Sequence, residues 1–149
     1  MKVAVDTNIL IYAEGINDDG RQQAARRVMH SLDPSLVVLP LQVLGELFRV
    51  LLRKSGRSPA EALAAVRLWR DGYAVAETST IAFDAALELS LRHRLQIWDA
   101  VIVAVAAEAG CRLLVSEDLQ DGFTWGGVTI VNPFSQPVHP LLNAVLGRS

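Results

Sequence analysis

The sequence predicts an α/β fold of three layers, with helices on both faces of a mainly parallel central sheet. Short apolar runs rich in β-branched residues alternate with longer segments of helical spacing along the whole chain, as in parallel sheets. The chain has 149 residues, of which 51% are hydrophobic and 20% charged. That length suits one domain, and that composition is typical of a folded chain and not of a disordered one.

The predicted strands are short apolar runs bounded by turn-forming residues. They are residues 3–5, 36–39, 73–76, 111–115 and 128–131. Between them the apolar residues recur at helical spacing, and Ser58-Pro59-Ala60-Glu61 has the form of a capping box that starts a helix. The predicted helices are about 18–32, 41–54, 59–70, 80–93 and 97–109. The domain is expected to span residues 1–132, and the tail 133–149 either packs on it or docks on a partner.

Composition also narrows the possible functions. The formal net charge is −2 and the pI is near 5.9, which argues against a broad basic face for duplex DNA but not against a local basic groove. The chain has one cysteine, Cys111, and three histidines without zinc-ligand spacing. The longest uninterrupted apolar run, residues 100–107, is too short to span a membrane. We therefore expect a cytoplasmic protein with no membrane partner.

Asp6 directly follows the predicted strand 3–5, and ligands of open parallel sheets bind at the carboxyl ends of strands. Thr7 and Asn8 add a hydroxyl and an amide that can hold the Asp6 carboxylate or a water on a metal ion. The alternative is that Asp6 only caps the helix after it, which Asp does readily. The other acids of the chain decide between the two interpretations.

The polar residues of helix 41–54 form one narrow stripe on an otherwise apolar surface. Gln42, Glu46, Arg49 and Arg53 follow one another at steps of four, three and four residues. One interpretation is a solvated stripe with a weak Glu46–Arg49 pair, which contributes roughly 0.3 kcal/mol. The other is a stripe that faces a cleft, with Glu46 near a metal ion and the arginines on phosphates.

Two further acids stand beside predicted structural elements. Asp99 lies in the first turn of the apolar helix 97–109, where an acid is also ordinary because of the helix dipole. The loop after strand 111–115 carries several acids, so its contribution is ambiguous. We favour Asp118, with Ser116 as a supporting hydroxyl and Asp121 as a weaker contributor, and Glu117 stays open as an alternative.

If the first and fourth predicted strands are neighbours, Asp6, Glu46, Asp99 and Asp118 converge. Carboxylates at close range resist shared ionisation unless a cation lies between them. Oxygen ligands without histidine or thiolate suit Mg²⁺ or Mn²⁺, and acids that hold Mg²⁺ on a phosphate are the usual arrangement for phosphodiester hydrolysis. We predict that Asp6, Asp99 and Asp118 bind the metal, with Glu46 bound directly or through water.

Four segments resemble, in order, the motifs of PIN-domain nucleases. They are Val-Ala-Val-Asp-Thr-Asn-Ile-Leu-Ile-Tyr-Ala at 3–13, Leu-Gly-Glu-Leu at 44–47, Ile-Trp-Asp-Ala at 97–100 and Leu-Val-Ser-Glu-Asp-Leu at 114–119. Each segment is short, but the ordered set is fairly specific and covers roughly residues 3–131. The size and the motifs look most like the VapC-type toxin ribonucleases of bacterial toxin–antitoxin pairs.

The resemblance implies a three-layer PIN-like fold and a Mg²⁺- or Mn²⁺-dependent endoribonuclease that cleaves single-stranded RNA or a structured RNA loop. It also implies a homodimer and a cognate antitoxin. The four acids would be catalytic, supported by Thr7, Asn8, Ser116 and Asp121, while Arg49 and Arg53 would contact the RNA backbone. Two alternatives remain. One is a PIN-like module that binds RNA or protein without cleavage, and the other is a different Mg²⁺ phosphohydrolase.

An antitoxin suited to this acidic cleft would carry an apolar helix followed by a basic tail. Arg is its expected contact with the carboxylates, because the guanidinium bonds a carboxylate with two parallel hydrogen bonds. Tyr12, Val43 and Leu47 are the candidate apolar surface for the helix. The alternative is that these residues belong to the core. The RNA target, the cut sequence, the antitoxin and the dimer surface do not follow from the sequence.

Overall fold

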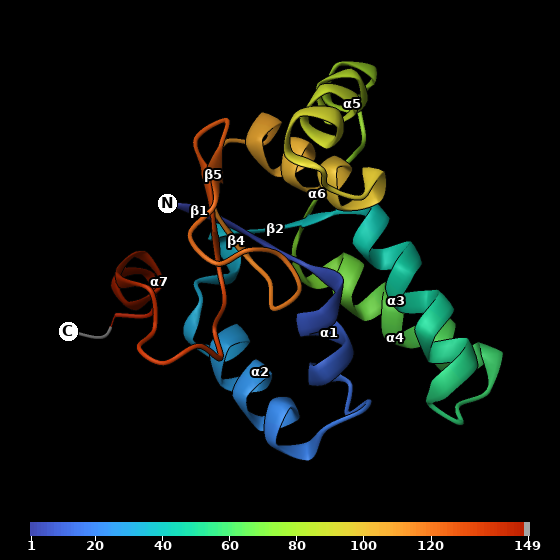
Figure 1. Ribbon diagram of the computed structural model, residues 1–149. Coiled ribbons are helices and arrows are strands. Elements are labelled where there is room, and N and C mark those ends of the chain that lie inside the picture. The colour runs from blue at the N-terminus through green and yellow to red at the C-terminus, as the bar shows by residue number, and fades with distance from the viewer. Residues whose placement is uncertain (148–149) are drawn as a thin grey trace.

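The computed structural model describes residues 1–147 and contains one sheet of six strands in the order β3-β2-β1-β4-β6-β5 (Figure 1). The strands are β1 Lys2–Val5, β2 Val37–Pro40, β3 Ala74–Ala76, β4 Cys111–Val115, β5 Thr124–Trp125 and β6 Val128–Val131. Neighbouring strands are parallel, except that β5 runs antiparallel to β6. The predicted α/β fold with a mainly parallel sheet is therefore confirmed.

Helices cover both faces of the sheet. They are α1 Thr7–Ala13, α2 Asp19–Ser31, α3 Leu41–Lys54, α4 Pro59–Gly72, α5 Thr80–His93, α6 Ile97–Glu108 and the short α7 Pro140–Val145. In Figure 1, α5 and α6 lie together on one side of the sheet, and α1 to α4 lie on the other. Right-handed crossovers produce this division, because β2 and β3 are added on one side of β1 while β4 is added on the other.

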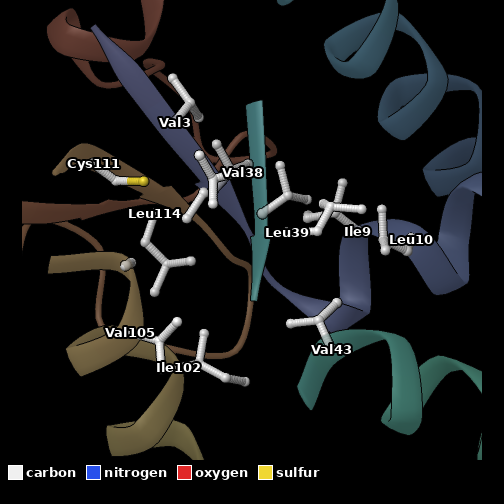
Figure 2. Close-up of a cluster of buried hydrophobic side chains, with 14 of the residues drawn as sticks. Val3, Ile9, Leu10, Val38, Leu39, Val43, Ile102, Val105, Cys111 and Leu114 are labelled. Carbon is white, nitrogen blue, oxygen red and sulfur yellow. The ribbon is translucent and has the colours of Figure 1, made fainter. Parts of the chain in front are cut away.

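The core lies on both faces of the sheet. Figure 2 shows Ile9, Leu10 and Val43 gathered on one side of the strands and Ile102 with Val105 on the other. Every residue of α6 from position 100 to 106 is buried, as expected for a helix that is apolar all round. Burial on both faces explains why the strands are continuous apolar runs and do not alternate.

Local signals in the sequence set most element ends. Ser58 and Glu61 form the predicted capping box at the start of α4, with both reciprocal hydrogen bonds present. The sequence did not predict β5, because a strand of two residues carries no periodicity. It pairs with β6 through the turn at Gly126 and Gly127, whose φ angles of 57° and 83° favour glycine.

The segment after Asn132 packs against the domain as far as it is described. The Phe134 ring meets the Tyr12 ring edge-on at 5.8 Å, and the Arg21 guanidinium lies 4.5 Å from the centre of the Phe134 ring. Leu142 of α7 is fully buried. In residues 1–147, no helix is both long enough and apolar enough to cross a bilayer.

Candidate active site

The carboxyl ends of β1 and β4 create the candidate site. The two strands are parallel neighbours with Val5 opposite Val115, and the Asp6 N–H donates to the Val115 carbonyl at 2.9 Å. The connection after β1 goes to one face of the sheet, and β4 is reached from the other face. Ligands of open α/β sheets bind at such a switch point. The condition set out from the sequence, that the first and fourth predicted strands are neighbours, is therefore met.

A cleft of about 460 Å³ opens there. Its lining combines acidic, basic and apolar residues from four segments of the chain. The residues that line it are Asp6, Thr7, Asn8, Ile11, Glu46, Arg49, Val50, Arg53, Lys54, Gln96, Trp98, Asp99 and Asp118. All four acids that the sequence singled out therefore face one space, together with both predicted arginines.

Asp6 both caps a helix and lines the cleft. Its Oδ1 accepts from the Thr7 N–H at 2.8 Å, which caps α1, and its Oδ2 accepts from the Ser116 hydroxyl at 2.7 Å. Only 4% of Asp6 is exposed. Burial raises the pKa of Asp6 to about 6, opposed by the bonds from Ser116 and Thr7 and reinforced by the nearby charges of Asp99 and Glu46. The two interpretations of Asp6 are compatible, since one carboxylate meets both requirements.

Asn8 cross-links the start of α1 to the loop after β4. Its amide nitrogen lies 3.3 Å from the Ser116 hydroxyl and 3.2 Å from Oδ2 of Asp118, to which it donates. Its amide oxygen accepts from the Glu117 N–H at 3.1 Å. Asn8 thereby orients the loop that brings Asp118 into the cleft.

The structure separates the two acids at the tip of the β4 loop. Glu117 points away from the cleft, where its carboxylate accepts from the Tyr12 hydroxyl at 2.6 Å and forms an ion pair with Arg21 at 2.8 Å. Asp118 lines the cleft and accepts from Asn8. The loop carboxylate that faces the other acids is therefore Asp118.

Asp121 does not lie where the sequence placed it. Its Oδ1 accepts from the Asn132 N–H at 2.8 Å, and it is absent from the residues that line the cleft. The structure therefore does not bring Asp121 to the acidic site, and the expectation that it supports this site is corrected. Asp121 instead ties its own loop to the end of β6, because two segments that leave the same sheet edge meet there.

Three residues of the polar stripe of α3, Glu46, Arg49 and Arg53, line the cleft. The Thr7 hydroxyl donates to Oε2 of Glu46, and the Gln42 amide donates to Oε1 of Glu46 at 2.8 Å. The same Gln42 nitrogen lies 3.1 Å from the Trp98 carbonyl, so it links α3 to α6. Each oxygen of the Glu46 carboxylate therefore accepts a hydrogen bond, and the two bonds fix the position of this side chain.

Asp99 lies in the first turn of α6 and lines the same cleft. The Gln96 side-chain oxygen caps the helix and accepts from the N–H groups of Trp98 and Asp99 at 2.8 and 3.1 Å. Burial raises the pKa of Asp99, and the neighbouring carboxylates of Glu46 and Asp118 raise it further. Asp99 therefore feels the charge of acids that come from two other elements.

The donor set fits a hard divalent cation. It consists of oxygen atoms, and the pKa values of Asp6 and Asp99 are raised in part by mutual repulsion that a cation would relieve. Within residues 1–147, no three acidic, histidine or cysteine side chains come close enough to enclose an ion. Mg²⁺ keeps several waters and is usually held by one or two carboxylates together with substrate phosphates, so it does not need three protein side chains around it.

Two sequence interpretations of the cleft surroundings need correction or addition. Val43 and Leu47 are 0% exposed, so they are core and offer no surface to a partner helix. Lys54 and Trp98 also line the cleft, although no pattern in the sequence singled them out. Lys54 directly follows the last residue of the polar stripe, and this position could have predicted its place in the cleft. Trp98 belongs to an apolar helix pattern, which predicts burial.

Comparison with known proteins identifies the family. The family model of the PIN domain matches residues 3–121. No curated protein matches the chain in sequence. Among solved structures, Mycobacterium tuberculosis VapC20, a sarcin-ricin loop cleaving toxin, is similar with a TM-score of 0.65 and 28% identity, over 76% of this chain and 87% of that one.

Two more distant structures share the fold. A toxin–antitoxin complex from Klebsiella pneumoniae matches with a TM-score of 0.69 and 19% identity, over 89% of this chain and 98% of that one. FitAcB from Neisseria gonorrhoeae matches with a TM-score of 0.65 and 14% identity, over 89% and 98%. The model match spans most of the chain, and the four motifs occur in it in order. The chain therefore belongs to the PIN-domain family, the nuclease family that its motifs resemble.

Proposed function

We propose that this protein is a Mg²⁺- or Mn²⁺-dependent endoribonuclease and the toxin of a toxin–antitoxin pair. The observation that carries the proposal is the convergence of Asp6, Glu46, Asp99 and Asp118 on one cleft, with Arg49 and Arg53 in the same lining. Acids that hold a cation beside basic groups that hold phosphates are the parts that phosphodiester hydrolysis needs. Family membership and the similarity to VapC20 support the same activity.

Each cleft residue has a role in this proposal. A bound Mg²⁺ or Mn²⁺ supplies charge stabilisation at the phosphate and eases deprotonation of water. Asp6, Asp99 and Asp118 would hold the ion, and Glu46, fixed by Gln42 and Thr7, would contact it directly or through water. Ser116 and Asn8 would keep the carboxylates aimed at the ion. Hydrolysis with departure of the 3′ oxygen leaves a 5′ phosphate and a 3′ hydroxyl, so no 2′ hydroxyl acts as the nucleophile.

The proposed substrate is single-stranded RNA or the unpaired part of a structured loop. Arg49, Arg53 and Lys54 give one flank of the cleft a positive charge although the whole chain has a formal net charge of −2. Contacts of this kind fix the phosphate backbone without reading the sequence. VapC20, at 28% identity, is described as cleaving the sarcin-ricin loop, which makes that loop the first substrate to test.

The proposed partners are a cognate antitoxin and a second copy of the chain. The Klebsiella pneumoniae structure with this fold is a toxin–antitoxin complex. A cleft lined by four acids invites a basic inhibitor, and Arg suits it because its planar group pairs bidentately with a carboxylate. Excess Mg²⁺ should then compete with such an inhibitor, because both bind the same carboxylates.

The test is cleavage of a mixed RNA pool by the purified protein with Mg²⁺, Mn²⁺ or a chelator. We expect metal-dependent endonucleolytic products with 5′ phosphates, lost in both Asp6→Asn and Asp118→Asn. Calorimetry should show metal binding that Asp6→Asn weakens strongly. RNA binding without cleavage would favour the non-catalytic module, and phosphate release from small esters would favour another phosphohydrolase. Products that end in a 2′,3′-cyclic phosphate would overturn the proposed hydrolysis.

A further inference from the structure

We propose that Trp98 is the platform on which an unpaired nucleobase stacks beside the phosphate to be cleaved, which makes it a specificity residue. This inference rests on the proposed ribonuclease function. Trp98 lies at the start of α6, next to Asp99, and is one of the residues that line the acidic cleft. The observations that carry the inference are its exposure, the way it is held and the charge around it.

The exposure of Trp98 is unusual for its helix. Trp98 is 50% exposed, whereas each of the residues 100–106 in the same helix is at most 3% exposed. Large aromatic side chains bury much apolar surface when they pack, so a half-exposed indole leaves a substantial stabilising contribution unused. That contribution becomes available to a ligand that covers the free part of the ring.

The indole is held ready for such a ligand. The backbone N–H of Trp98 donates to the Gln96 side chain at 2.8 Å, and the backbone carbonyl of Trp98 accepts from the Gln42 amide at 3.1 Å. The Phe83 ring lies beside it, with 6.5 Å between the ring centres and 39° between the planes. The backbone of Trp98 is therefore fixed, and a ring that already rests against a second aromatic ring has less conformational freedom to lose when a base stacks on it.

The charges of the cleft favour nucleic acid as the ligand. Arg49, Arg53 and Lys54 line the same cleft as Trp98. A basic flank that follows the phosphates, combined with an aromatic ring that stacks on bases, is the arrangement by which proteins bind single strands. A base within a duplex has both faces covered by its neighbours, so the platform selects unpaired nucleotides.

The position of Trp98 defines which nucleotide it contacts. Consecutive Cα atoms lie about 3.8 Å apart, so Trp98 and Asp99 are close enough to contact neighbouring parts of one substrate. If Asp99 helps to hold the cation at the reacting phosphate, the stacked base belongs to a nucleotide on one side of that phosphate. A base at this single position should therefore matter more for cleavage than bases further away.

The first experiment measures binding in the inactive Asp6→Asn background, so that the RNA stays intact. The probe is an adenosine RNA of about 12 nucleotides, compared with the same strand in a duplex. We expect the single strand to quench tryptophan fluorescence and the duplex to quench it much less. Adding Trp98→Phe should abolish the quenching yet keep most of the affinity, because a flat ring remains. Adding Trp98→Leu should weaken binding by about 5- to 100-fold.

Leu91→Ala is the matched control, because Leu91 is an exposed apolar residue of the neighbouring helix α5 and does not line the cleft. It should change neither quenching nor affinity. Thermal melting of each variant checks that the fold is kept. Unchanged RNA affinity in a folded Trp98→Leu variant would overturn the proposal. A Trp98→Leu variant that binds RNA normally but binds a protein partner more weakly would also overturn it, because Trp98 would then belong to a protein interface.

The second experiment places one abasic nucleotide at each position around a mapped cleavage site. With the protein that keeps Trp98, an abasic nucleotide at one position should slow cleavage strongly. Trp98→Leu should slow cleavage of the intact RNA. The same variant should slow cleavage of the RNA with that abasic nucleotide only slightly further. Independent, additive losses would contradict stacking at that position. If the protein cleaves no RNA at all, the proposed function fails, while the quenching experiment still decides whether Trp98 stacks on bases.

Discussion

The hydroxyl of Ser116 donates to Oδ2 of Asp6 at 2.7 Å and so joins two residues that are 110 positions apart in the chain. The bond follows from the parallel register of β1 and β4, which places the residues after Val5 and Val115 side by side. Asp6 is buried, which disfavours its charge, and the Ser116 hydroxyl favours that charge. The pair thus controls how much of the central carboxylate is ionised near neutral pH.

Replacing Ser116 with Ala should move the pH dependence of cleavage. Loss of the donor removes a bond that lowers the pKa of Asp6, so this pKa should rise above about 6. A hydrogen bond to a charged group contributes about 1.5–3 kcal/mol, so cleavage at pH 6.5 should fall by roughly 4- to 40-fold and recover at higher pH. Ser90→Ala is the control, because the Ser90 hydroxyl bonds the Leu95 carbonyl outside the cleft. An equal loss at every pH would contradict this explanation.

Replacing Asp6 with Asn should stabilise the metal-free protein at alkaline pH. The folded-state pKa of about 6 lies above the ordinary 3.8, so the stability linked to the Asp6 proton is present below about pH 4 and is lost as the pH rises through 6. The charged form then costs on the order of 3 kcal/mol at pH 8. Because Asn replaces an acceptor oxygen by a donor, the net gain should be about 1–3 kcal/mol.

Urea unfolding with a chelator at pH 4, 6 and 8 measures this effect as the difference between the two proteins. The difference should be largest at pH 8 and should fall by about 2–3 kcal/mol toward pH 4, where Asp6 is neutral and only the exchange of an oxygen for an amide nitrogen remains. Added Mg²⁺ should stabilise the unchanged protein at pH 8 and leave Asp6→Asn nearly unaffected, since binding to the folded state adds to stability. If the difference in unfolding free energy between the two proteins does not vary with pH, ionisation of Asp6 does not destabilise the folded protein.

The two adjacent acids of the β4 loop should behave in opposite ways. Asp118→Asn should reduce cleavage by at least about a hundredfold, because its carboxylate faces the cleft. Glu117→Gln should keep cleavage within a fewfold and instead lower the free energy of unfolding by about 1 kcal/mol, because it weakens the contacts with Tyr12 and Arg21. Parallel assays of cleavage and unfolding test both. Loss of activity in Glu117→Gln with Asp118→Asn active would reverse the assignment.

Arg53→Ala should weaken RNA binding and reduce its dependence on salt. Each phosphate contact that is lost lowers the slope of log K against log salt by about 0.7 for a single strand. Arg67→Ala is matched to it, because Arg67 is an exposed arginine of the next helix and does not line the cleft. Filter binding at several salt concentrations compares the two. Equal slopes for both variants would place Arg53 in plain solvent.

Much of the fold followed from the sequence because its signals are local or periodic. The apolar runs of β1 and β4 and the capping box at Ser58 predicted elements close to those observed. The acids at the ends of β1 and β4 then predicted the cleft, because parallel strands present their carboxyl ends at one edge. The polar stripe of α3 predicted Glu46 and Arg53 on one surface, which the cleft lining confirms.

The missed features depend on what lies across from a residue. Periodicity showed that α3 is apolar on most of its surface, but not that other layers bury Val43 and Leu47 completely. The all-apolar pattern of α6 hid the exposed ring of Trp98 for the same reason. The choice between Glu117 and Asp118 rests on hydrogen bonds to Asn8, more than a hundred positions away, and no local pattern encodes such a contact.

The strand order also determines when the cleft can exist during synthesis of the chain. Asp6 is made about a hundred residues before its neighbour strand β4, and β6 must then join β4 on its far side. A nascent chain that has folded only α1 to α4 carries Asp6 and Glu46 without Asp99, Ser116 or Asp118. A truncated or stalled product therefore has no complete set of acids, and the cell is exposed to a finished cleft only when nearly the whole domain has left the ribosome.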